Sequence, residues 1–205
     1  MVEVLDNAFQ LAVLIVCLAV SLVHFSRGHG DEWLMASGFF GCYLLGLTYW
    51  IAYLMVFGET PRYFYVPDVA WAASYVFLLM LVAALDERRQ PCAPVPMAWV
   101  AAAAMVPHFA LYVTHGDVLL NVVECSIMAA IGYFAVRGIA SAPVEGPEGD
   151  RRLHAAILIW WMAQLAVWTT SCFWGAVSFT PYIASDLLVS VSLLALLLEM
   201  RRALP

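Results

Sequence analysis

The chain is built almost entirely from apolar runs of 18 to 25 residues, separated by short connectors that carry charges, prolines and glycines. A helix crosses the roughly 30 Å hydrocarbon core of a bilayer with about 20 apolar residues. The runs lie at approximately 9–26, 33–57, 65–85, 97–114, 118–136, 153–176 and 181–199. We therefore expect an all-α integral membrane protein with seven transmembrane helices, a multi-pass protein of the cell membrane whose single membrane domain covers residues 1–205.

The composition supports lipid as the surrounding solvent. Hydrophobic residues make up 64% of the sequence and charged residues 12%, against roughly 45–50% and about 25% in a soluble domain. The chain has no lysine, and its nine basic residues are all arginines. This bias is typical of a GC-rich bacterial genome, and it excludes lysine chemistry. A formal net charge of −6 gives no basis for binding nucleic acid.

The cysteines do not show the paired spacing of a zinc site, and four of the five fall in apolar runs. They are Cys17, Cys42, Cys92, Cys125 and Cys172. We expect small hydrophobic side chains here, with neither a disulfide framework nor a metal site. The first apolar run follows the acidic residues Glu3 and Asp6 where a signal peptide would have basic ones. We interpret this run as the first membrane helix.

The arginines indicate an orientation. Eight of them fall on one side of the predicted membrane and Arg62 alone on the other. The eight are Arg27, Arg88, Arg89, Arg137, Arg151, Arg152, Arg201 and Arg202. Positive charge accumulates in cytoplasmic connectors, so we expect the N-terminus outside and the C-terminus inside.

An internal repeat relates the two halves of the chain. A shift of 118 residues aligns 47–79 with 165–197 without a gap and matches Trp50 with Trp168 and Asp68 with Asp186. We expect a 3+1+3 bundle of parallel repeats, a plan that recurs in transporters. Repeat 1 would cover about 9–90, a linker helix about 97–114 and repeat 2 about 118–202. Chance similarity between two apolar hairpins is the alternative.

Ionisable residues inside apolar runs are costly and need an explanation. Asp68, Asp186, Glu124 and His108 all fall in the predicted outer half of the membrane, and Gln164 lies near its middle. An aspartate in a first helical turn can simply complement the helix dipole, and a histidine after Pro107 can bond a free carbonyl. Glu124 lies beyond the first turn of its helix, so it is the strongest candidate for a ligand or proton site.

Two tryptophans, Trp50 and Trp168, occupy equivalent repeat positions at greater depth than the interfacial aromatic belt. Packing against neighbours or lipid would explain them. Together with the carboxylates they also form the expected lining of a pocket for a cation, through charge pairing and cation–π contact. The predicted ligand-binding residues are therefore Asp68, Glu124, Asp186, His108, Trp50, Trp168 and Gln164.

Two membrane families share part of this plan. Microbial rhodopsins are similar in their seven helices, outer N-terminus and aspartates on helices 3 and 7, but the position of their retinal lysine is Ser190 here. Retinal bound as a Schiff base is therefore excluded. Sugar and amino-acid carriers with a three-one-three plan share the topology, but their Pro-Gln signature is missing. We assign no family.

Cofactor chemistry is not expected. Haem would need two facing histidines, and His24 and His154 are more typical of a membrane interface. A zinc hydrolase would have His108 as its only histidine among the candidate residues. We predict neither haem nor metal, and an enzyme is the less favoured class.

These features favour a transporter that binds a small cationic or amine ligand in an outward-facing acidic and aromatic pocket. Proton coupling through Glu124 extends that mechanism. The alternatives are a seven-helix sensor acting on a separate signalling partner and a membrane subunit of a larger complex. The sequence leaves the ligand's identity and the oligomeric state open, including a homo-oligomer.

Overall fold

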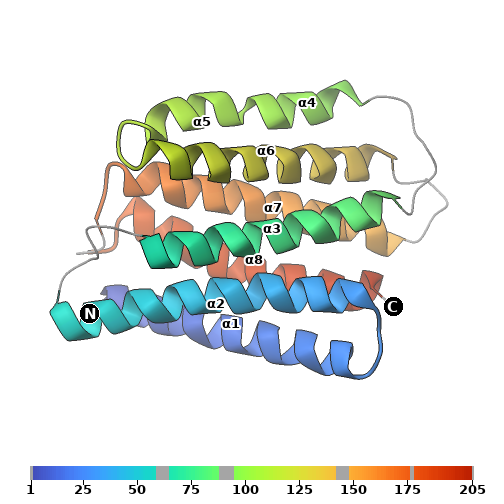
Figure 1. Cartoon of the computed structure of the whole chain (residues 1–205), viewed down its shortest axis with the longest axis horizontal. Coiled ribbons are helices and arrows are strands. Elements are labelled where there is room, and N and C mark those ends of the chain that lie inside the picture. The colour runs from blue at the N-terminus through green and yellow to red at the C-terminus, as the bar shows by residue number, and fades with distance from the viewer. Residues whose placement is uncertain (1, 59–64, 88–94, 142–147, 176–177, 205) are drawn as a thin grey trace.

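The structure is all helical over the residues that it describes, with no strand among them (Figure 1). It is a computed structural model of residues 2–58, 65–87, 95–141, 148–175 and 178–204. The helices are α1 (Val2–Ser26), α2 (Asp31–Phe57), α3 (Tyr65–Glu87), α4 (Pro96–Ala103), α5 (Met105–Tyr112), α6 (Val118–Ser141), α7 (Glu148–Ser171) and α8 (Pro181–Ala203).

Six of these helices, α1, α2, α3, α6, α7 and α8, are long and apolar enough to cross a membrane. The predicted run 97–114 differs, because it forms the two short helices α4 and α5, which together reach only from Pro96 to Tyr112. Proline has no N–H to bond the carbonyl four residues earlier, and its ring crowds that carbonyl. Pro107 therefore explains why the helix is interrupted close to Ala104.

Helix ends follow local signals in the sequence. α8 begins with a proline at Pro181, where the missing N–H costs nothing. α2 ends at Gly58, which adopts a left-handed conformation with φ of 70° and donates its N–H to the Leu54 carbonyl at 2.9 Å. α1 begins at Val2, well before the predicted start at residue 9, so Asp6 lies inside this helix.

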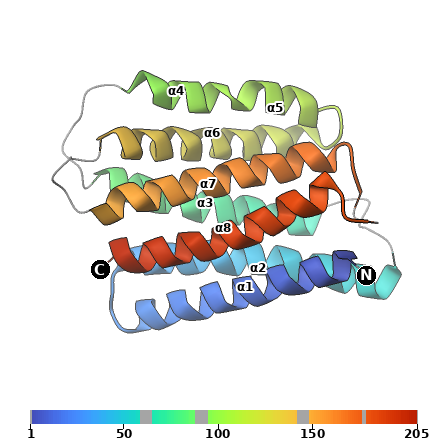
Figure 2. The same cartoon turned by 180° about the vertical axis from the view of Figure 1, so that it is seen from behind.

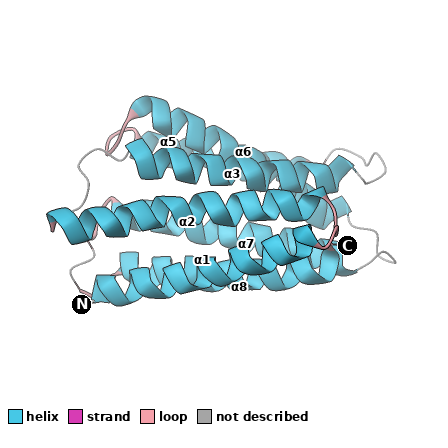
Figure 3. Ribbon diagram, turned by 60° about the horizontal axis from the view of Figure 1, so that its bottom comes forward, coloured by secondary structure: helices cyan, strands magenta, loops and turns pink. Residues whose placement is uncertain are grey.

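The helices form a ring in the order α1, α2, α3, α6, α7, α8, with α8 returning to pack on α1. Helices α4 and α5 lie outside the ring against α6, and α5 also contacts α7. Figures 1 and 2 show α4 and α5 along one edge and α1 along the opposite edge. Figure 3 shows the same layering from below. Side chains from six long helices therefore converge on one central region.

The centre is packed with aromatic rings, and the outer surface is apolar. Trp160 makes an edge-to-face contact with Phe39, their centroids 5.2 Å apart, and Tyr75 lies 5.7 Å away on its other side. Large apolar side chains such as Val16 and Leu45 are exposed on the outside. An apolar exterior is what a bilayer requires of the helices that it surrounds.

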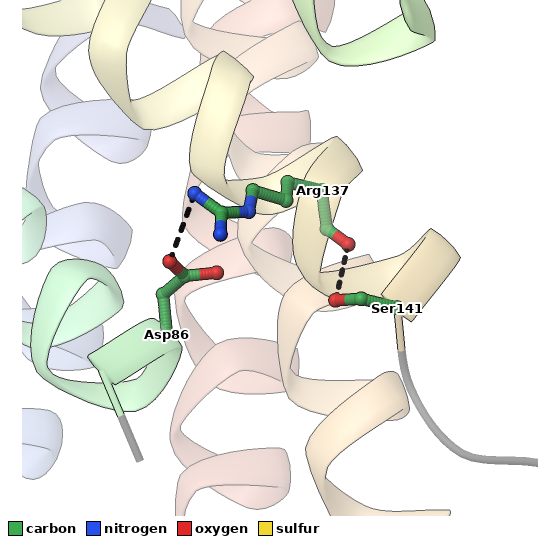
Figure 4. A network of polar contacts seen from close by, with 3 residues as sticks. All are labelled: Asp86, Arg137 and Ser141. Atoms are coloured by element: carbon green, nitrogen blue, oxygen red, sulfur yellow. Dashed lines mark hydrogen bonds and ion pairs between the residues drawn. The ribbon is translucent and has the colours of Figure 1, made fainter. Parts of the chain in front are cut away.

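One end of the bundle carries the described arginines. Here Arg137 of α6 pairs with Asp86 of α3 at 3.3 Å, and the Ser141 hydroxyl donates to the Arg137 carbonyl at 2.7 Å (Figure 4). We call this the arginine end, and the opposite end, where α1, α3, α6 and α8 begin, the N-terminal end. Of the residues used in the predictions above, Arg62, Arg88, Arg89 and Cys92 lie outside the described residues.

Candidate functional site

A cavity of about 570 Å³ occupies the centre of the ring towards its N-terminal end. Helices α1, α2, α3, α5, α6, α7 and α8 and the connection between α5 and α6 all contribute to its lining. The connection supplies His115 and Asp117, and α6 follows directly because the Asp117 carboxylate accepts the backbone N–H of Leu120 at 3.0 Å.

The fold brings most of the sequence-predicted residues to this cavity. Those that line it are Asp68, Glu124, Asp186, Trp50, Trp168 and Gln164. His108 is the exception. Its ring Nδ1 lies 2.8 Å from the carbonyl of Ala104, at the interruption between α4 and α5. In this position the imidazole interacts with a backbone carbonyl of its own helix, and His108 is not in the described lining of the cavity.

Three carboxyl groups gather on one side of the cavity. Asp68 of α3 lies close enough to both Asp117 and Glu124 for their charges to interact. Asp68 and Glu124 are both half-buried, and all three line the cavity. No arginine is present in the described lining, and its one basic side chain is His115, so carboxyl groups outnumber basic groups on this wall.

The fourth carboxyl group, Asp186 of α8, lies on another wall. It is 8% exposed, and its Oδ1 accepts a hydrogen bond from Gln10 Nε2 at 2.9 Å. Asp6 of α1 contacts the same carboxyl group and is 5% exposed. Asp6 is not among the predicted site residues, because the predicted first membrane helix begins after it, at residue 9.

Aromatic rings complete the walls. Trp71 of α3 lies between Trp50 and Tyr43 of α2, with ring centroids 6.2 Å and 6.5 Å away. On the α7 side, Trp168 meets Tyr112 edge to face at 5.5 Å. These tryptophan and tyrosine faces carry the negative quadrupole that attracts a cation.

Polar contacts hold the α7 wall in one arrangement. The Tyr43 hydroxyl donates to Gln164 Oε1 at 3.0 Å, which joins α2 to α7 across the bundle. The Tyr112 hydroxyl lies 3.2 Å from Thr169 Oγ1. Because the Tyr43 bond occupies Gln164 Oε1, the amide of Gln164 retains its N–H donors for other groups.

The surroundings of the histidine, cysteine and carboxylate side chains bear on the metal and haem sites considered from the sequence. Among the described residues, no group of three or more histidine, cysteine, aspartate or glutamate side chains is arranged to hold a metal ion. The two histidines considered for haem have separate surroundings. His24 stacks on Trp33 with centroids 4.3 Å apart, whereas His154 is fully buried with Nδ1 2.7 Å from the Asp150 carbonyl.

Comparison with known proteins found no matching family model, no matching curated protein and no matching solved structure. The function is therefore argued from the cavity itself.

Proposed function

We propose that this helical, multi-pass membrane protein binds a small cationic or amine ligand in its central cavity and transports it across the membrane. The observation that carries the proposal is the lining of the cavity. Asp68, Asp117, Glu124 and Asp186 face a space bounded by tryptophan and tyrosine rings, with no arginine in the described lining. A cation gains both charge pairing and cation–π contact there, whereas an anion meets a wall in which carboxyl groups outnumber basic groups.

The size of the cavity suits a small organic ligand. Pockets for such molecules measure roughly 300–1,000 Å³, and this one measures about 570 Å³. Residues of the α5–α6 connection lie in its lining, which supports an opening at the N-terminal end of the bundle. The arginine distribution favours that end as the outer one, so the proposed site faces outwards.

The packing of the helices supports a transporter built from two repeats. Within a 3+1+3 plan, α1, α2 and α3 correspond to α6, α7 and α8, and α4 with α5 forms the seventh, linking span. The contact between α1 and α8 then has its counterpart in the contact between α6 and α3. A twofold axis along the membrane normal would relate these two helix contacts to each other in this way.

Ligand binding tests the proposal directly. We expect tetramethylammonium and benzylammonium, but not sodium, to raise the thermal stability of the purified full-length protein and to alter its tryptophan fluorescence. Glu124→Gln preserves shape and removes the charge. It should weaken benzylammonium binding about tenfold or more, since hydrogen bonds to a charged group contribute about 1.5–3 kcal/mol, and it should weaken tetramethylammonium binding through the loss of charge pairing alone. Asp31→Asn makes a comparable change at an exposed residue of the arginine end and should bind like the parent protein.

Failure of both organic cations to bind the parent protein, or full binding by Glu124→Gln, would contradict the proposal. Uptake of the bound cation into liposomes separates the two main classes of function. A transporter accumulates the cation inside, whereas a sensor or a subunit of a larger complex binds it without uptake.

A further inference from the structure

Asp6 and Asp186 form a pair of carboxyl groups beside the cavity. Asp68 and Glu124 both line the cavity, whereas only one member of the Asp6–Asp186 pair is in its described lining. Asp6 and Asp186 contact each other between α1 and α8 and are at least nine-tenths buried. Oδ1 of Asp6 is buried and has no hydrogen-bond partner in the part of the chain that the structure describes. Asp186 lines the central cavity, but Asp6 does not. An unpartnered buried carboxyl oxygen is costly, so this pair needs a reason beyond packing.

Asp6 lines a different space. A second, smaller hollow of about 170 Å³ lies beside the start of α1, and Asp6 is the one polar residue in the described part of its lining. The remaining lining residues are Val2, Leu5, Phe179, Ile183 and Leu187. The Asp6–Asp186 pair therefore connects two spaces, with one carboxyl group on the small hollow and the other on the central cavity.

The internal repeat relates this pair to the pair inside the cavity. The 118-residue shift that matches Asp68 with Asp186 also matches Asp6 with Glu124. In space the pairs cross between halves, because Asp6 contacts Asp186 while Glu124 interacts with Asp68. The two pairs are thus equivalent in the repeat but different in their surroundings. Both members of the Asp68–Glu124 pair face the cavity, whereas one member of the other pair is withdrawn from it.

Two carboxyl groups in contact away from water cannot both be ionised without strong repulsion, so such a pair shares one proton. Among the described residues, the titratable groups close to this pair are Tyr43 on α2 and Tyr182 on α8, with Glu3 of α1 close to Tyr182, and none of them is basic. Gln10 adds an amide donor to Asp186. None of these neighbours carries a positive charge that could stabilise both carboxylates in place of the shared proton.

We propose, on the basis of the transport function proposed above, that the Asp6–Asp186 pair is the proton-coupling site and that the Asp68–Glu124 pair receives the cation. A cation in the cavity stabilises the ionised form of Asp186. The O–H bond on Asp186 breaks as an O–H bond forms on Asp6, and Asp6 then gives that proton to water at the small hollow. The site therefore exchanges one proton for one bound cation, and no oxidation or reduction takes place.

The first experiment does not depend on any ligand. Infrared spectroscopy of the full-length protein in liposomes at neutral pH measures the C=O stretching band of protonated carboxyl groups. We expect Asp6→Asn and Asp186→Asn each to remove the contribution of one carboxyl group, and the exposed control Asp31→Asn to leave the band unchanged. A band unchanged in both pair variants would overturn the assignment, and either variant decides it if the other does not fold.

The second experiment separates this proposal from the binding proposal. Tetramethylammonium has no proton to release, so acidification after its addition to weakly buffered protein comes from the protein. We expect Asp6→Asn to bind tetramethylammonium as the parent protein does but to release one proton fewer per bound cation. Equal proton release by both proteins would contradict the coupling role. Absence of binding to the parent protein would contradict the cation proposal instead, and the infrared band would still decide the state of the pair.

Discussion

The hydroxyl group of Tyr43 on α2 donates a hydrogen bond of 3.0 Å to Gln164 Oε1 on α7, and this bond fixes Gln164 in the cavity wall. Tyr43 and Gln164 are both buried, at 5% and 4% exposure, so the amide oxygen has little access to another donor. At the scale of individual residues, this bond links the stability of the bundle to the shape of the site.

Tyr43→Phe should therefore lower the free energy of unfolding by about 0.5–1.5 kcal/mol, the usual net contribution of one hydrogen bond. It should also weaken tetramethylammonium binding, because the Gln164 amide becomes free to reorient. Thermal unfolding in detergent and a fluorescence titration measure the two effects. Tyr53→Phe is a matched control on the same helix, where the ring packs on Phe57 outside the cavity lining. Equal effects from both substitutions would show that the Tyr43 hydroxyl has no special role.

The sequence indicated three of the carboxyl groups that line the cavity, because charged residues are rare in apolar helices and each needs a reason, but it did not indicate Asp117. Asp68, Glu124 and Asp186 stood out on that ground alone. Asp6 did not stand out, because it lies before the predicted first span at 9–26 and an acidic residue outside a span needs no special explanation. Extending the repeat by the same shift would have matched Asp6 with Glu124. Hydropathy predicts how deep a residue lies in the membrane, but it does not predict which faces of two helices pack against each other.

At the scale of helices, close approach depends on positions without a side chain. A Cβ atom added at Gly138 of α6 would lie 1.9 Å from Cδ2 of His154 on α7, an impossible distance. His154 is fully buried, so its ring has little space into which to move. Small residues permit such contacts between membrane helices.

Gly138→Ala should destabilise the protein by about 1–3 kcal/mol, as overpacking of a filled core does. Gly41→Ala is the matched control, since its added Cβ would meet only Cδ1 of Leu18 at 3.5 Å, an ordinary contact. Because alanine favours helix over glycine, the control should be neutral or slightly stabilising. Thermal unfolding of both variants in the same detergent measures the difference. Equal stability of the two variants would contradict the packing described for α6 and α7.

Helix boundaries were predictable where apolar runs end in charges or glycine, as at Gly58. They were less so where a proline lies within an apolar run. The run 97–114 has the composition of one membrane helix, yet Pro107 removes a backbone bond and the chain forms α4 and α5. The sequence shows the proline but not whether neighbouring groups compensate for it. In the structure His108 lies beside the Ala104 carbonyl at that point, which agrees with the alternative interpretation of a histidine after Pro107 as a partner for a backbone carbonyl.

At the scale of the whole molecule, charge is divided between the two ends. The arginine end contains the Arg137–Asp86 pair, whereas the N-terminal end contains the carboxyl-lined cavity. The tendency of positively charged connectors to stay in the cytoplasm predicts that the arginine end is the inner face and the N-terminal end the outer face. The cavity would then open outwards, where a cationic ligand first meets the protein.

Cysteine labelling in intact cells tests that orientation. With all five native cysteines replaced, single cysteines at Ser178 and His29 report on opposite ends, since both positions are exposed in connections between helices. Ser178 lies between α7 and α8 at the N-terminal end, and His29 lies between α1 and α2 at the arginine end. We expect a membrane-impermeant maleimide to label Ser178→Cys in intact cells and His29→Cys only after the membrane is opened. The reverse pattern would place the cavity on the cytoplasmic side, and the proposed ligand would then approach it from the cytoplasm.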